Sequence, residues 1–409
     1  MIRSFKYRLY VTKEQDIVLD KQLEEARALY NLLLEASIKA YKEDNKSLLG
    51  YKLNELSLRL RKEKGLSISA QSSQEIAGRI TKAFKNFFRR LNEGKRGNSL
   101  GYPRFKANRR YESITFPQYP HCFKLLDEDT LSIWNVGISR IKYLKDINGK
   151  IKTLTLKKEP TGNWYAVIIC DGITGKRKAP TEDKAIGIDV GLTSLITTSE
   201  GTVVNNPHFL KKAETILIRR DKQLSKKMKR SKNRYKAILK LAKAYRKTTR
   251  RRETFLHNLT SKLISEYKII ALEKLNVVGL AKNHRLSKQI LDVRWSEFVR
   301  QLIYKAEEAG SIILQVDPRN TSKKCSKCGW KDEDQTLADR MFKCENCGLE
   351  LDRDINAARN ILKTGLNTLG RREINACGDE TSVLEKTKAR LVVEARKNEK
   401  RPVGRFRSY

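Results

Sequence analysis

Polar and apolar residues alternate over residues 4–11, which is the pattern of a half-buried β-strand. From residue 14 to residue 42 the apolar residues instead recur every three or four positions, and this spacing predicts a helix. Residues 48–61 and 70–91 continue the helical spacing. The N-terminal part of the chain is therefore expected to form one strand followed by a lobe of helices.

Short β-type runs take over between residues 113 and 170, where turn sequences such as Asn148-Gly149 separate them. The expected strands cover residues 125–126, 131–133, 138–143, 151–157 and 164–170. Glycines and prolines between residues 94 and 120 mark the boundary with the preceding helices. We expect these strands to form a small antiparallel barrel, completed by the strand at residues 4–11.

The second half of the chain begins with apolar runs at residues 185–189 and 193–198, which predict a hairpin-like pair of strands. No Gly or Pro occurs between Pro207 and Gly279, and a long helical segment over residues 211–252 is rich in Lys and Arg. Because like charges repel along a helix, we interpret this segment as a surface for a phosphate backbone. The alternative is an ordinary solvated helix face.

The composition agrees with a nucleic-acid partner. Lys and Arg number 86 against 47 Asp and Glu, which gives a formal net charge of +39 and an isoelectric point near 10.0. Such a surface attracts polyphosphate, and its affinity falls as salt is added. A hydrophobic content of 39% over 409 residues suits several folded domains, whereas a histone-like or ribosomal packing protein is the alternative. No apolar run approaches the roughly 18 residues that a membrane span needs, so we expect no membrane partner and a cytoplasmic location.

Four cysteines form two CxxC pairs: Cys325, Cys328, Cys344 and Cys347. In a reducing compartment, pairs with this spacing act as thiolate ligands rather than as disulfides. Four cysteines in this arrangement are typical of a zinc ribbon, in which one tetrahedral zinc ion has a structural role. The other three, Cys122, Cys170 and Cys377, stand alone and are expected to be packing residues.

Three acidic residues stand at the ends of predicted elements. Asp189 closes the apolar run at 185–188, Glu273 closes the run at 269–272, and Asp354 opens a helical segment. Carboxylates suit Mg²⁺, and a pair of such ions about 4 Å apart can activate water and stabilise the leaving oxygen of a phosphodiester. The chain has no GxxxxGK[ST] loop, which disfavours hydrolysis of nucleoside triphosphates.

Five motifs together resemble those of TnpB, a family of transposon-encoded RNA-guided endonucleases related to type V CRISPR effectors. The motifs are GYPRFK at 101–106, GIDVG at 187–191, LEKL at 272–275, TSKKCSKCG at 321–329 and DRDINAA at 352–358. The resemblance covers about residues 1–365, and it implies a multidomain α+β and α/β fold. In that fold a ribonuclease-H-like (RuvC) nuclease domain carries an inserted zinc ribbon with four cysteine ligands, and a β-barrel wedge domain carries an inserted helical recognition lobe.

The resemblance also implies domain boundaries. They are residues 1–11 and 101–180 for the β-barrel, 12–100 for the recognition domain, 181–320 and 351–365 for the nuclease domain and 321–350 for the zinc ribbon. Residues 366–409 have no counterpart in the family and are expected to be a charged tail. Asp189, Glu273 and Asp354 would hold two Mg²⁺ ions, with Asp352 lying behind them. The single site would cut both strands of DNA in turn.

The partners that the resemblance implies are a guide RNA from the transposon end and a double-stranded DNA target, bound by a monomeric ribonucleoprotein at the nucleoid of a prokaryotic cell. The RNA would read most of the target by base pairing, and the protein would read a short adjacent motif. Gln74 and Gln118 are our predicted readers of that motif, because amide side chains suit adenine edges.

Two other functions remain open. The chain could be a nuclease-inactive, RNA-guided DNA-binding repressor, in which case the target is bound without nicks. It could also be a recombinase or transposase with a ribonuclease-H fold, in which case strand-transfer products form.

Overall fold

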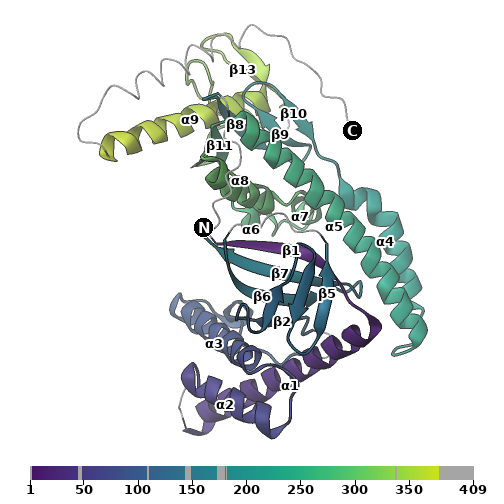
Figure 1. The fold of residues 1–409 in the computed structure, drawn as a ribbon. Coiled ribbons are helices and arrows are strands. Elements are labelled where there is room, and N and C mark those ends of the chain that lie inside the picture. Colours follow the sequence, from purple (N-terminus) through teal and green to yellow (C-terminus); the bar gives the residue numbers. More distant parts are fainter. Residues whose placement is uncertain are drawn as a thin grey trace. The chain divides into compact units, whose positions relative to one another are not determined.

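The structure is a computed structural model that describes residues 2–44, 48–107, 110–142, 149–172, 180, 182–336 and 339–376. Cys377 and most of the tail expected at 366–409 lie outside these residues. The chain divides into two compact units (Figure 1). Unit 1 comprises Met1–Gly175 with Ile238–Ala242, and unit 2 comprises Lys176–Ala237 with Lys243–Tyr409. The finer boundaries given above stay a prediction.

Unit 1 contains a seven-stranded antiparallel sheet. In chain order its strands are β1 (Arg3–Tyr10), β2 (Ser113–Phe116), β3 (Phe123–Leu125), β4 (Thr130–Ile133), β5 (Gly137–Ile141), β6 (Lys150–Lys158) and β7 (Trp164–Asp171). The order across the sheet is β2-β6-β7-β1-β5-β4-β3. The N-terminal strand therefore completes the sheet as expected, by pairing with β7 on one side and β5 on the other. Strands β2 and β3 are the two edges of this sheet, and they are not paired with each other. The sheet is therefore only a partly closed form of the expected barrel.

The three expected helices of unit 1 are confirmed as α1 (Lys13–Asp44), α2 (Tyr51–Glu63) and α3 (Ala70–Asn92), and a short 3₁₀ helix, η1 (Gly97–Leu100), follows them. The first turn of α3 is capped by Ser69, whose Oγ accepts a hydrogen bond from the Ser72 amide at 3.0 Å. The Ser72 hydroxyl donates in turn to the carbonyl oxygen of Thr115 at 2.9 Å, which ties α3 to β2.

Unit 2 is built on a five-stranded mixed sheet with the order β10-β9-β8-β11-β12. Its strands are β8 (Ala185–Val190), β9 (Ser194–Thr198), β10 (Val203–Asn205), β11 (Ile269–Glu273) and β12 (Ile312–Val316). Strands β8, β11 and β12 run parallel, and β8 pairs with β9 as the expected antiparallel hairpin.

The helices of unit 2 are α4 (Phe209–Ser225), α5 (Lys232–Glu266), α6 (Val277–Leu280), α7 (Ser287–Val293), α8 (Trp295–Ala309) and α9 (Arg353–Ala376). The prediction of one long helical segment over 211–252 was wrong, because the chain turns between α4 and α5. Ser231 starts α5 by accepting a hydrogen bond from the Arg234 amide at 3.1 Å. A serine cap needs neither glycine nor proline, so the break left no trace in the pattern of those residues.

Both faces of the unit 2 sheet are covered. Ile270 and Leu272 of β11 belong to an apolar cluster with residues of α5 and α8, whereas Ile269 and Ala271 belong to a second cluster with Ile361 of α9. Successive residues of a strand point to opposite faces, so β11 alone shows that α9 lies on the face opposite α5 and α8. Among the described residues, no helix is long and apolar enough to cross a membrane.

Candidate active site and metal centre

The parallel pairing of β8 and β11 brings two of the predicted acids to one edge of the sheet. Leu272 lies opposite Ile188 in this ladder, and Glu273 and Asp189 are the next residues along each strand. Both side chains therefore leave the sheet at the carboxyl ends of its parallel strands, which is where open α/β sheets bind ligands.

Helix α9 brings the third acid, Asp354, to the same place. It packs so closely on β8 that a Cβ atom at Gly187 would lie 2.0 Å from the carbonyl oxygen of Ala358. Ala357 and Ala358 are fully buried at this contact. Because only glycine permits the approach, Gly187 sets the distance between the strand that carries Asp189 and the helix that begins beside Asp354.

The other two carboxylates act electrostatically on Asp189. Burial, and then the charges of Glu273 and Asp354, raise the pKa of Asp189 to about 8. Burial also raises the pKa of Glu273, and a hydrogen bond from Thr321 opposes that shift. All three acids are partly buried. A nearby cation favours the charged form of such a carboxylate, and carboxylate oxygens are the donors that Mg²⁺ prefers. The three acids are therefore the candidate ligands of a divalent metal ion. Among the described residues, the group of possible ligands whose donor atoms all lie within 4.8 Å of one another is that of the four cysteines.

Asp352 has a different structural role from Asp354. Its Oδ1 atom accepts hydrogen bonds from the backbone amides of Asp354 at 2.9 Å and Ile355 at 3.2 Å. These are the contacts of a helix N-cap. The guanidinium of Arg353 lies 3.3 Å from Oδ1 of Asp354 and adds a positive charge beside the acids.

Sequence reasoning missed three polar residues around the acids. The hydroxyl of Thr321 donates to Oε1 of Glu273 at 2.5 Å, and the amides of Asn356 and Asn360 reach from α9 to the segment that carries Thr321. The available signal was a pair of asparagines four residues apart in a helical segment, since asparagine is a poor helix former that needs a reason to be there.

The four cysteines of the CxxC pairs gather as predicted, with all four sulfur atoms within 4.8 Å of one another. The Sγ atoms of Cys325 and Cys347 are 3.6 Å apart, and those of Cys328 and Cys344 are 3.5 Å apart. A tetrahedral zinc ion with bonds of about 2.3 Å needs sulfur atoms ~3.8 Å apart, so the cluster fits zinc. A two-stranded hairpin, β13 (Met341–Lys343) with β14 (Glu350–Asp352), connects it to α9.

The two predicted DNA-reading glutamines are both exposed and lie in neighbouring segments of unit 1. Gln74 is in the first turns of α3. Gln118 is in the loop after β2, where its carbonyl oxygen accepts from the Cys122 amide at 2.9 Å. The thiol of Cys122 lies 3.8 Å from Oε1 of Gln71, so the loop runs beside the start of α3.

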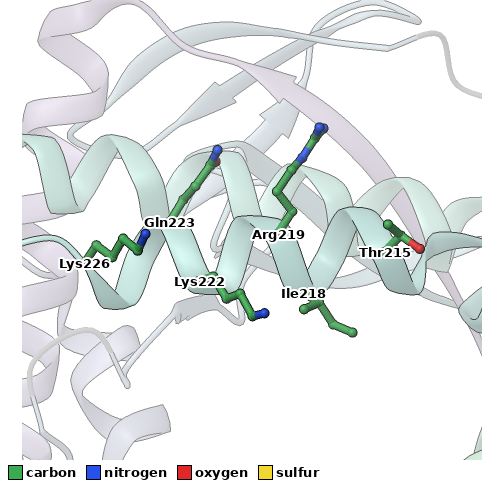
Figure 2. Close-up of a pocket in the computed structure, with 6 residues that line it drawn as sticks. All are labelled: Thr215, Ile218, Arg219, Lys222, Gln223 and Lys226. Atoms are coloured by element: carbon green, nitrogen blue, oxygen red, sulfur yellow. The ribbon is translucent and has the colours of Figure 1, made fainter.

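The basic helix α4 bears a surface hollow of about 480 Å³ (Figure 2). The residues that line it are Thr215, Ile218, Arg219, Lys222, Gln223 and Lys226. Three of the six carry a positive charge, so the hollow suits an anionic group.

Three family models match successive parts of the chain. They are described as a helix-turn-helix domain over residues 1–46, a probable transposase over 160–284 and a Cas12f1-like TNB domain over 295–361. The last of these spans the cysteine cluster and the start of α9.

Similar proteins cover most of the chain. A protein of Streptomyces pristinaespiralis named "Putative RNA-guided DNA endonuclease" is 31% identical over 386 residues, which cover 92% of this chain and 91% of that one. An Escherichia coli K12 protein of the same description, InsQ, is 28% identical over 76% of each chain. Among solved structures, a Cas12f1-sgRNA-target DNA complex matches with a TM-score of 0.52 at 16% identity, over 88% of this chain and 98% of that one. That likeness supports the fold.

Proposed function

Since this chain belongs to the TnpB family of RNA-guided DNA endonucleases, we propose that it hydrolyses phosphodiester bonds in double-stranded DNA that a guide RNA selects together with a short adjacent motif. One observation carries the chemical part of the proposal. Three carboxylates from β8, β11 and α9 meet near the carboxyl edge of a parallel sheet, where burial, and then the charges of Glu273 and Asp354, raise the pKa of Asp189.

In the proposed reaction, Asp189, Glu273 and Asp354 hold two Mg²⁺ ions. When bound, these ions supply the charge that makes water a nucleophile and that stabilises the leaving oxygen. The chain itself fixes the three carboxylates: the strands set Asp189 and Glu273, the cap at Asp352 sets the first turn of α9, and Arg353 lies against Asp354. The four cysteines hold one zinc ion, whose part is structural.

The partners follow from charge and from family. A net charge of +39 favours polyanions, and we assign the basic helices α4 and α5 to a phosphate backbone. Gln74 and Gln118 are proposed to read the adjacent DNA motif. We further propose a monomeric ribonucleoprotein in the cytoplasm of a prokaryotic cell, at the nucleoid, with a guide RNA transcribed from the transposon end.

The test begins with protein purified from cells that contain the native flanking DNA. Its bound RNA is sequenced, and the complex is given Mg²⁺ and a plasmid library with a matching target and randomised flanks. We expect motif-dependent cuts that disappear in Asp189→Ala, while RNA and DNA binding persist. Asp127→Ala, in an exposed turn of unit 1, is the matched control and should cut normally.

The alternatives give different products. Stable target binding without nicks would identify a repressor, and strand-transfer products would identify a recombinase. Cleavage by Asp189→Ala near the wild-type rate would contradict the assignment of the site.

A further inference from the structure

Thr321 has one hydroxyl proton and two acceptors within reach. Oε1 of Glu273 lies at 2.5 Å and the carbonyl oxygen of Pro318 lies at 3.1 Å. A hydroxyl donates one proton, and a hydrogen bond to a carboxylate is shorter and stronger than one to a neutral carbonyl. Thr321 is also buried, with 8% of its surface exposed, so water competes little for the proton. The hydroxyl therefore holds one oxygen of Glu273.

Helix α9 fixes the backbone at that threonine and after it. The side-chain amide of Asn360 donates to the carbonyl oxygens of Thr321 at 2.8 Å and Lys324 at 2.6 Å. Asn356, one turn earlier, donates to Lys324 at 2.7 Å and accepts from the Ser326 amide at 2.9 Å. Both asparagines are buried. We call the chain from Thr321 to Ser326 the leading segment; two amides of α9 clamp it.

The cysteine cluster holds the same segment from its other end. Cys325 lies within it, is buried, and has its sulfur atom 3.6 Å from that of Cys347. Its amide also donates to the carbonyl oxygen of Trp330 at 2.7 Å. The leading segment is thus fixed between the cysteine cluster and the helix that carries Asp354, and from there it reaches Glu273.

We propose that Thr321 is a positioning residue that orients the Glu273 carboxylate for a divalent cation, and that the cysteine cluster and the Asn356–Asn360 clamp set the place of its hydroxyl. This inference rests on the proposed function, because it takes Glu273 as a metal ligand. Groups that hydrogen-bond to metal ligands typically change metal affinity by about 10–100-fold when they are removed. Loss of the hydroxyl should therefore weaken cation binding and leave RNA binding unchanged.

The experiment compares Thr321→Val, which keeps the shape and loses the hydroxyl, with Thr321→Ser, which keeps the hydroxyl. Thr368→Val is the matched control, since the hydroxyl of Thr368 is exposed and donates to the carbonyl oxygen of Thr364 on its own helix. Each protein is titrated with Mn²⁺, and free Mn²⁺ is followed by electron paramagnetic resonance. The Mg²⁺ concentration for half-maximal cleavage is measured in parallel, and bound zinc is counted.

For Thr321→Val we expect about tenfold weaker Mn²⁺ binding and a similar rise in the Mg²⁺ requirement, with one zinc ion retained. Thr321→Ser should recover most of the loss, and Thr368→Val should match the wild type. Wild-type Mn²⁺ affinity in Thr321→Val would overturn the inference. If the wild-type protein binds Mn²⁺ at this site and never cuts DNA, the proposed function fails instead.

Asn360→Asp tests the clamp without relying on the threonine variant. The aspartate has the same size but an ionised carboxylate donates no hydrogen bond, so the Thr321 carbonyl oxygen loses its partner and the Lys324 carbonyl oxygen keeps only Asn356. We expect weaker Mn²⁺ binding with zinc retained. Unchanged Mn²⁺ affinity would remove the clamp from the proposal.

Discussion

The two predicted metal sites of unit 2 are built in opposite ways. The cysteine cluster takes its four ligands from one short stretch of chain, and a two-stranded hairpin closes that stretch on itself. The carboxylate cluster takes its members from two strands and a helix that lie far apart in the sequence. The first site is defined by local spacing, and the second exists only when the whole sheet and α9 have assembled.

The two sites also differ in how ready their ligand groups are for a metal ion. The cysteine sulfurs already stand near tetrahedral spacing, which is the geometry of a closed structural site. At the other site, burial of Asp189, and then the charges of Glu273 and Asp354, raise the pKa of Asp189 to about 8. The difference teaches that a strongly shifted pKa marks a candidate functional site, whereas a closed set of thiolates marks a structural one.

The largest test of the comparison is Gly187→Ala. The added methyl group would overlap the Ala358 carbonyl, so α9 must move away from β8. We expect cleavage to fall about 100-fold, because misplacement of about 1 Å has that cost, and stability to fall by about 1–3 kcal/mol. Zinc content should not change. Gly78→Ala, where a Cβ meets nothing within 4 Å, is the control; cleavage and thermal melting give the result.

Next in size is Cys344→Ser, which breaks the local site. We expect the zinc ion to be lost and, through the leading segment, the Mg²⁺ requirement to rise about tenfold. Cys122→Ser changes a cysteine of unit 1, so it serves as the control and should keep the zinc ion. Metal analysis and cleavage at graded Mg²⁺ provide the measurements. A zinc-free protein with an unchanged Mg²⁺ requirement would show that the two sites are independent.

A smaller effect is expected from pH. The folded-state pKa of Asp189 is raised above its unfolded value, so folded protein holds the proton between about pH 4 and pH 8. Stability without divalent cations should therefore fall as pH rises through this window and level off above it. Over the same pH range, the fall in melting temperature of Asp189→Asn should be smaller than that of the wild type by about 3 °C. Identical pH profiles for the two proteins would mean that Asp189 is not protonated in the fold.

The smallest effect separates the two acids of the DRD motif. Asp352→Ala removes the cap of α9 and should cost about 1 kcal/mol, whereas Asp352→Asn keeps a capping oxygen and should melt near the wild-type temperature. Cleavage should persist in Asp352→Asn and disappear in Asp354→Ala. Loss of cleavage in Asp352→Asn at an unchanged melting temperature would move Asp352 among the metal ligands.

The features that were predictable from sequence are those with a local signal. The cysteine spacing, the β8–β9 hairpin and the helices of unit 1 follow from positions a few residues apart. The three acids were found because Asp189 and Glu273 close apolar runs and Asp354 opens a helical segment. Strands β2, β10 and β12 were not predicted. Length alone does not explain this, since β12 is as long as β9 and β11, which were predicted. The hydrogen bond from Thr321 to Glu273 joins the turn after β12 to the end of β11. No pattern within either segment predicts it.

The packing of α9 on β8 also bears on the order in which the protein is made. A ribosome releases β8, β11 and β12 well before α9, and until then the apolar residues Ile269 and Leu314 lack the helix that covers them. The nascent chain also lacks Asp354. Vectorial synthesis thus makes the carboxylate cluster one of the last features of the described chain to form.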